Sequence, residues 1–232
     1  TLFTRALAED SLYALAYAGL GEAYWRKYEA TKEIEWVDLA IQNCRAAQKR
    51  SDLLAPVHLT LAIVYKGTGK YREAVDELQK VLQVDPVNSD AFRELADAYA
   101  KLNKSDEVEQ TYRKAIELKP NYWANYYNLG LFYYRRGEYK KSAEKFLTVT
   151  DLSPRNYRAF RNLGVIYVAM ERYEEARKMC ERAIEINPNY ASAYANLGLV
   201  HFTTQDYQQA ARSYEKALEL SDSNYLHWGN LA

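Results

Sequence analysis

Apolar and small residues follow a helical spacing along this chain. In residues 123–156 the fourth, seventh, eighth and eleventh places are Tyr126, Leu129, Gly130 and Tyr133. This is the i, i+3, i+4, i+7 pattern of one helix face. A second run with the same logic surrounds small residues at the twentieth and twenty-seventh places. The segment therefore predicts two helices with a turn between them.

The pattern recurs at a fixed period. Four prolines, Pro86, Pro120, Pro154 and Pro188, stand 34 residues apart. The seventh place of five successive segments holds Leu61, Leu95, Leu129, Leu163 and Leu197, and the eleventh holds Tyr65, Tyr99, Tyr133, Tyr167 and His201. Repetition at such a period indicates an array of similar helix pairs, each packed on its neighbours.

Local signals mark where each helix should begin and end. Turn sequences such as "GTGKY", "RRGEY" and "TTQDY" separate the first helix of a pair from the second. The residue before each proline is biased away from helical geometry, so the second helix should end there. An asparagine follows each proline within two residues and is a candidate cap for the next helix, at Asn88, Asn121, Asn156 and Asn189.

These places closely resemble the tetratricopeptide repeat over nearly the whole chain. The resemblance implies an all-α fold, a right-handed solenoid of antiparallel helix pairs. We expect a single solenoid over residues 1–232, with a partial helix at 1–13, six repeats and a partial repeat at 225–232. The six repeats are expected at 14–54, 55–88, 89–122, 123–156, 157–190 and 191–224.

The first full repeat carries an insertion. From Tyr24 to Ala40 there are 7 residues more than between Tyr65 and Ala74 in the next repeat. We expect longer helices there, with an exposed aromatic edge around Trp25 and Trp36 that would serve as a docking surface.

Composition narrows the classes of partner. Lys plus Arg and Asp plus Glu both number 31, so no net positive field favours nucleic acid. No apolar run is long enough for a membrane helix, and the first residues lack the layout of a signal peptide. Because Cys44 and Cys180 are the only cysteines, we expect a reducing, cytoplasmic setting. The chain begins without Met, so we expect a fragment of a longer protein.

A second stripe on each first helix lies roughly opposite the packing face, at places two, five, six, nine, twelve and thirteen. The stripe is not simply polar. Place nine is apolar at Leu131, Val165 and Leu199, and place six carries an asparagine ladder at Asn128, Asn162, Asn196 and Asn230. A helix that is apolar on two faces needs cover on both, which predicts a ligand along the stripe.

The resemblance implies that these stripes line a concave groove that receives an extended peptide or a helix. An asparagine amide offers donors and an acceptor that match a peptide backbone. We expect the following peptide-binding residues: Arg93, Asp97, Tyr127, Asn128, Leu131, Tyr134, Arg158, Arg161, Asn162, Val165, Asn196, Leu199 and Phe202. In a second interpretation, the asparagines bond only within their own array.

One variant of the family grips a C-terminal acidic motif with a carboxylate clamp. Arg93, Asn128 and Arg158 occupy matching places. Asp97, however, stands where an asparagine is expected and would repel a carboxylate, and Asn162 stands where a base is expected. These departures count against the clamp.

Catalysis finds little support in the sequence, so we expect no enzyme, no metal and no cofactor. His58 and His201 replace aromatic residues at packing places, with no Ser, Cys or carboxylate expected beside them. Cys44 and Cys180 fall at core places. Arg135 and Arg136 are typical of a solvated helix end favoured by the helix dipole.

The sequence therefore predicts a protein-interaction scaffold without chemistry of its own. The runs "YALAYAGLGEAYW" and "NYWANYYNLGLFYYRRGEY" are similar to the repeat region of bacterial signalling proteins such as Ser/Thr kinases and adenylate cyclases. That similarity implies a regulatory or docking arm. A self-association module and an undetected enzyme remain the alternatives.

Overall fold

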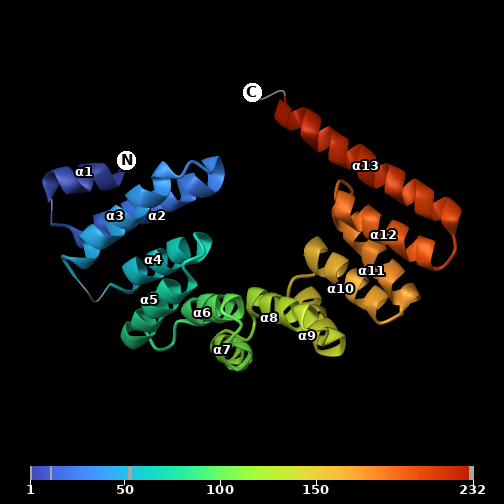
Figure 1. Cartoon of the computed structure of the whole chain (residues 1–232), viewed down its shortest axis with the longest axis horizontal. Coiled ribbons are helices and arrows are strands. Elements are labelled where there is room, and N and C mark those ends of the chain that lie inside the picture. Colours follow the sequence, from blue (N-terminus) through green and yellow to red (C-terminus); the bar gives the residue numbers. More distant parts are fainter. Residues whose placement is uncertain (1, 11, 52–53, 230–232) are drawn as a thin grey trace. The chain divides into compact units, whose positions relative to one another are not determined.

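The computed structural model describes residues 2–10, 12–51 and 54–229, and for Leu7 and residues 222–229 it describes the backbone alone. These residues form α-helices and no strand (Figure 1). The helices are α1 (Leu2–Glu9), α2 (Ala14–Thr31), α3 (Glu35–Gln48), α4 (Ala55–Gly67), α5 (Tyr71–Val84), α6 (Ser89–Lys101), α7 (Ser105–Leu118), α8 (Trp123–Arg135), α9 (Tyr139–Leu152), α10 (Tyr157–Ala169), α11 (Tyr173–Ile186), α12 (Ala191–Thr203) and α13 (Tyr207–Gly229).

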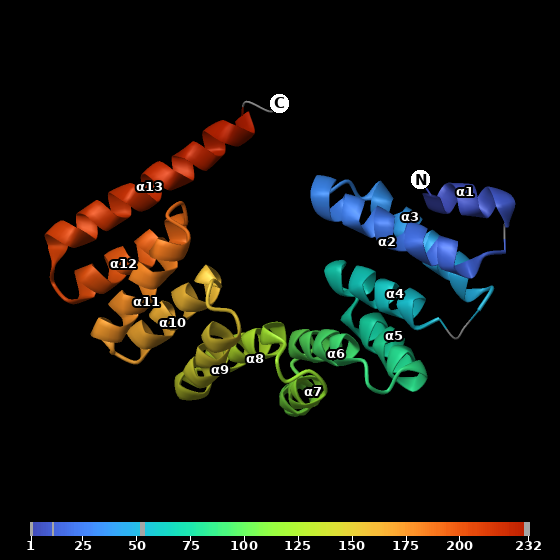
Figure 2. The same ribbon diagram turned by 180° about the vertical axis from the view of Figure 1, so that it is seen from behind.

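The helices pack in consecutive pairs, and the chain divides into two compact units. Unit 1 is residues 1–120 and unit 2 is residues 121–232. In unit 1 the pairs are α2 with α3, α4 with α5, and α6 with α7, and in unit 2 they are α8 with α9, α10 with α11, and α12 with α13. Figure 2 shows the same pairs from behind. Within each unit, the second helix of one pair also packs on the first helix of the next.

The prolines end the second helices as the sequence predicts. Helices α5, α7, α9 and α11 each end two residues before a proline. The residue between helix and proline lies outside the helical region in each case, for example Asp85 with φ −132° and ψ 83°. The steric restriction on the residue before proline therefore sets these boundaries.

The predicted asparagine caps are confirmed in two repeats and wrong in two. Asn88 accepts a hydrogen bond from the Ala91 amide at 2.9 Å, and Asn156 accepts one from the Ala159 amide at 3.2 Å. At α8 and α12 the N-cap residues are Tyr122 and Tyr190, with no side-chain cap bond. There the asparagine directly follows the proline, one residue too early to cap.

The turns between first and second helices share one left-handed residue. It lies at the fifteenth place of each of the last five repeats, with φ of 79° at Gly69, 58° at Asn103, 74° at Gly137, 57° at Glu171 and 64° at Gln205. Glycine adopts this conformation without steric cost, whereas a residue with a Cβ is strained there. The turn geometry is therefore preserved even where the residue type does not favour it.

The insertion lengthens α2 to 18 residues, whereas α3 keeps 14. Its predicted exposed edge is wrong for Trp25, which is only 6% exposed. The indole packs beside Val37 and Val64 and fills the space over Gly67, where an added Cβ would lie 2.2 Å from the ring. Trp36 is partly exposed and stacks on Tyr24, with ring centroids 5.9 Å apart.

The end of the chain differs from the expected repeat frame. Helix α13 runs without a break from Tyr207 to Gly229, through the boundary expected between residues 224 and 225. The position that corresponds to the four prolines is Asp222, so the signal that ends the earlier second helices is missing. Asn230, the last rung of the asparagine ladder, lies outside the described residues.

Small residues at the eighth place let the two helices of a pair approach closely. A Cβ added at Gly164 would lie 2.6 Å from Sγ of Cys180, and one added at Gly130 would lie 2.9 Å from the Phe146 ring. Both cysteines are fully buried, as the repeat frame predicts. Burial raises the pKa of the Cys44 thiol to about 12, and that of Cys180 likewise.

Candidate functional site

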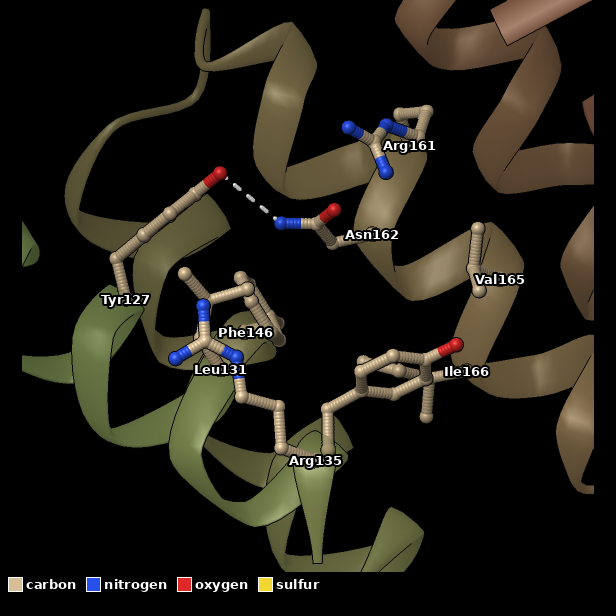
Figure 3. A pocket seen from close by; sticks show the side chains of 9 residues that line it. Tyr127, Leu131, Arg135, Phe146, Arg161, Asn162, Val165 and Ile166 are labelled. Carbon is tan, nitrogen blue, oxygen red and sulfur yellow. Dashed lines mark hydrogen bonds between the residues drawn. The ribbon is translucent and has the colours of Figure 1, made fainter. Parts of the chain in front are cut away.

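A pocket of about 360 Å³ opens between α8 and α10 in unit 2, with α9 behind it (Figure 3). We call it the α8–α10 pocket. It is lined by Tyr127, Leu131, Tyr134, Arg135, Phe146, Arg161, Asn162, Val165 and Ile166. The α8 residues are spaced i, i+4, i+7 and i+8, so they share one helix face. Six of the thirteen predicted peptide-binding residues therefore lie around one cavity.

A hydrogen bond joins the two walls of the pocket. Nδ2 of Asn162 donates to the Tyr127 hydroxyl at 3.0 Å, across the step from one repeat to the next. Asn162 is only 7% exposed, and the Tyr127 ring packs edge-on against Phe146 with centroids 5.1 Å apart. No described residue donates to Oδ1 of Asn162, which leaves an acceptor at the pocket wall. The Nδ2 group of Asn162 therefore bonds within the solenoid itself, as the second interpretation of the asparagine ladder expects.

The pocket carries two guanidinium groups and no acid. Figure 3 shows Arg135 reaching into it from α8 and Arg161 from α10. Arg161 donates Nε to the Tyr190 hydroxyl at 3.3 Å, and neither arginine forms an ion pair with any described residue. The neighbouring Arg136, by contrast, lies 2.6 Å from Glu138. The site is therefore locally positive although the chain as a whole is neutral.

The other predicted residues of unit 2 lie outside the pocket. Arg158 is exposed at the start of α10, with its guanidinium 5.8 Å from the Tyr157 ring centroid. Asn128 is partly buried on α8. On α12, Leu199 and Phe202 are 43% and 57% exposed. Nδ2 of Asn196 is buried without a hydrogen-bond acceptor in the part of the chain that the structure describes.

In unit 1, Arg93 and Asp97 already form ion pairs with neighbouring side chains. Arg93 pairs with Asp90 at 3.2 Å and with Glu94 at 2.9 Å. Asp97 lies 3.3 Å from Nζ of Lys66 and accepts a hydrogen bond from the Tyr112 hydroxyl. Burial opposes the ionisation of Glu94, but Lys66 and Arg93 outweigh it and lower the pKa of this carboxyl. A carboxylate ligand at Arg93 would have to compete with these acids.

The histidines confirm one expectation and overturn another. His58 is buried in the core of unit 1, as expected of a packing residue. A carboxylate does lie beside it, however: Oε2 of Glu77 is 2.6 Å from Nδ1 of His58, and Nε2 of Gln48 is 3.2 Å from both. His58 and Glu77 lie on the two helices of one repeat and Gln48 on the helix before, so the contact depends on how these helices pack, which repeat spacing does not specify. The cluster satisfies polar groups inside the core.

Sequence reasoning also missed three residues that line the pocket. Arg135 is exposed in the last turn of α8, as expected, but it also lines the cavity. Phe146 and Ile166 belong to packing faces and form the apolar floor. The sequence does contain a signal for Arg135. It stands at place thirteen, which belongs to the same stripe as Tyr127 and Leu131.

The described parts of the chain contain neither a cluster of metal ligands nor a helix suited to cross a membrane. No group of three or more His, Cys, Asp or Glu side chains in residues 2–10, 12–51 and 54–229 is placed to hold a metal ion. Over those same residues, no helix combines the length and the apolar character needed to cross a bilayer.

Models of the tetratricopeptide repeat family match most of the chain. One model matches residues 155–223, a second matches 66–130, and a third matches 1–48 and 109–157. Together they cover well over half of the sequence.

Two curated relatives illustrate the range of proteins that share this repeat. "Tetratricopeptide repeat protein 21 homolog" of Caenorhabditis briggsae is 29% identical over 123 residues, which are 53% of this chain and 9% of that protein. The "Peroxisomal targeting signal receptor" of Candida glabrata is 30% identical over 88 residues, 38% of this chain and 15% of the receptor. The chain thus spans less than a fifth of either relative.

Solved structures confirm the predicted fold class. MamA superposes with a TM-score of 0.64 at 22% identity, covering 71% of this chain and 96% of MamA. A chain of the Cut9–Hcn1 complex has a TM-score of 0.75 at 12% identity, covering 95% of this chain and 42% of that one. YrrB, described as a TPR protein with an unusual peptide-binding site, has a TM-score of 0.59 at 25% identity and covers 83% of this chain and 96% of YrrB.

Proposed function

Because the chain belongs to the tetratricopeptide repeat family, we propose that it is a protein-interaction module that binds an extended polypeptide segment along the first helices of unit 2. The observation that carries this proposal is the α8–α10 pocket, where six residues of the predicted stripe surround one cavity. The bound segment would place a side chain in the pocket and lay its backbone along α10 and α12.

The pocket wall offers the groups that an extended backbone needs. Oδ1 of Asn162 is an acceptor for a backbone N–H, while Leu131 and Val165 offer apolar steps on either wall. The exposed Leu199 and Phe202 continue the apolar stripe on α12, which packs beside α10. Burying such apolar surface would supply binding energy of about 25 cal/mol per Å² before the costs of association.

Two similar proteins support this assignment by analogy. YrrB is described by its peptide-binding site, and the Candida glabrata receptor is named for a targeting signal. The first description names a peptide ligand, and the second names a receptor for a signal. The regulatory or docking arm of a larger bacterial signalling protein remains a finer proposal that rests on sequence resemblance alone.

Self-association is the second candidate, because the last repeat exposes large apolar side chains. Phe202, Tyr207 and Leu218 are 57%, 60% and 63% exposed. A second copy packed on this face would shield them. Analytical ultracentrifugation over a range of concentrations would separate the two: a constant monomer mass favours the peptide-binding proposal, and a mass that doubles favours self-association.

The test uses peptides selected from a random-peptide phage library on the immobilised protein. A selected peptide, labelled with a fluorophore, is titrated with wild type and with a Leu131→Asp/Val165→Asp variant. We expect the variant to lose binding, since a charge on each apolar step costs its desolvation. Leu147→Asp, on the exposed face of α9, is the matched control and should bind as wild type does. Equal binding by the pocket variant and wild type, with unchanged melting curves, would place the ligand site elsewhere.

A further inference from the structure

The two arginines of the α8–α10 pocket constrain the ligand. Within the described residues neither Arg135 nor Arg161 has an acidic partner, although other arginines of unit 2 do: Arg172 lies 2.7 Å from Glu175, and Arg177 lies 2.8 Å from Glu174. Both guanidinium groups line one pocket, so together they attract an anion to it.

The rest of the lining favours a singly charged ligand with an apolar stem. Four of the nine lining residues, Leu131, Phe146, Val165 and Ile166, are wholly apolar and would contact methylene groups well. A doubly charged phosphate loses more hydration energy in such a place than a carboxylate does. The planar guanidinium fork matches a carboxylate with two parallel hydrogen bonds.

The position of the charges separates this pocket from the carboxylate clamp considered for the family. The clamp places are Arg93, Asn128 and Arg158, and none of them lines this cavity. Arg161 stands at place five, as Arg93 does in its own repeat, whereas Arg135 at place thirteen has no counterpart among the clamp residues. Asn162 itself lines the pocket, so a backbone bonded to it would direct a side chain into the cavity.

We propose that the α8–α10 pocket binds an acidic side chain of an internal residue in a bound polypeptide, with the carboxylate held between Arg135 and Arg161. This inference rests on the proposed function and adds the chemistry of the residue recognised. Asn162 would accept the backbone N–H of the same or the adjacent residue. The Tyr127 hydroxyl, already an acceptor from Asn162, keeps its own hydrogen to donate to the carboxylate.

The test uses a probe with a single carboxylate, N-acetyl-glutamate N-methylamide. It is titrated into ¹⁵N-labelled protein while the Nε–Hε signals of arginine side chains are followed by NMR. We expect saturable shifts at Arg135 and Arg161, and none with the glutamine analogue, which has the same shape without the charge. Loss of charge-assisted hydrogen bonds should make binding to Arg135→Gln at least about tenfold weaker. Arg136→Gln, which alters the neighbouring arginine, is the control and should bind the probe as wild type does.

Several outcomes would overturn the proposal. Equal shifts with the glutamine analogue would show that the pocket does not distinguish a carboxylate from a neutral amide. Tighter binding of N-acetyl-leucine would assign the site to a C-terminal carboxylate, and tighter binding of N-acetyl-phosphoserine N-methylamide would assign it to a phosphate.

A separate readout distinguishes this failure from failure of the proposed function. If the selected phage peptide still requires Leu131 and Val165 while the glutamate probe causes no shift, only the acidic assignment falls. If the peptide binds the Leu131→Asp/Val165→Asp variant as it binds wild type, the proposed function itself has failed.

Discussion

The hydrogen bond between Asn162 and Tyr127 allows a direct test of whether the asparagine ladder supports the fold. Asn162→Ala removes the 3.0 Å hydrogen bond that joins the two repeats. Asn162 is only 7% exposed. A neutral hydrogen bond contributes about 0.5–1.5 kcal/mol net. Since Tyr127 is only partly buried and water can replace the lost partner of its hydroxyl, we expect a loss of about 1 kcal/mol.

For a chain of this size, a loss of that magnitude should lower Tm by about 2–4 °C. Asn196→Ala is the matched control, because Nδ2 of Asn196 is already buried without an acceptor. Removing an unsatisfied polar group costs little, so this variant should melt like wild type or slightly higher. Thermal and urea unfolding followed by circular dichroism measure both variants.

A double-mutant cycle with Tyr127→Phe isolates the bond itself. If the contact acts as described, the effects of Asn162→Ala and Tyr127→Phe will be non-additive by about 0.5–1.5 kcal/mol. Additive effects, or an Asn162→Ala protein as stable as wild type, would refute the structural role and restore Asn162 to a purely ligand-binding one.

Three further predictions concern the helix seams, the turns and the thiols. Gly164→Leu should lower stability by about 1–3 kcal/mol by forcing side-chain atoms onto Cys180, whereas Ala169→Leu on the exposed end of α10 should not; identical melting curves for the two would contradict the packing described. At the left-handed turn place, Gly137→Ala should lower stability by about 1 kcal/mol, and Glu171→Gly should raise it by a smaller amount. Urea midpoints that shift in the same direction for both variants would count against backbone strain as the cause. The folded-state pKa of about 12 at Cys44 and Cys180 lies above the reference value of 9.0, so the unfolded chain loses these protons first and stability should fall between about pH 9 and pH 12. A Cys44→Ala/Cys180→Ala variant should show a shallower fall in urea midpoint over that range, and an unchanged slope would show that the thiols do not contribute.

The repeat spacing was enough to predict the helices because it depends on local rules. Leucines at the seventh place and small residues at the eighth specify which face packs, and the residue before each proline specifies where a helix ends. Where a local signal is shifted by one residue, as at Asn121 and Asn189, the expected cap is absent. Where it is missing, as at Asp222, the helix continues.

The candidate site was only partly predictable because repeat spacing does not specify the partner of each side chain. Spacing places Asn162 and Arg93 on equivalent stripes, yet Asn162 bonds to Tyr127 and Arg93 pairs with Asp90 and Glu94. These partners depend on rotamers and on the distance between neighbouring helices, neither of which is encoded in the period. Phe146 illustrates the same limit, since a core residue of a second helix also forms the floor of a pocket.

The contact between Trp25 and Gly67 has a consequence for sequence divergence among relatives of this protein. The indole fills the volume that any side chain at position 67 would occupy, since an added Cβ would lie 2.2 Å from the ring. Neither residue can change freely while the other stays. Homologues that keep the long α2 should therefore exchange size between the two positions, with a larger residue at 67 accompanied by a smaller one at 25. Such paired replacements would show that homologues keep the volume shared by these two positions constant.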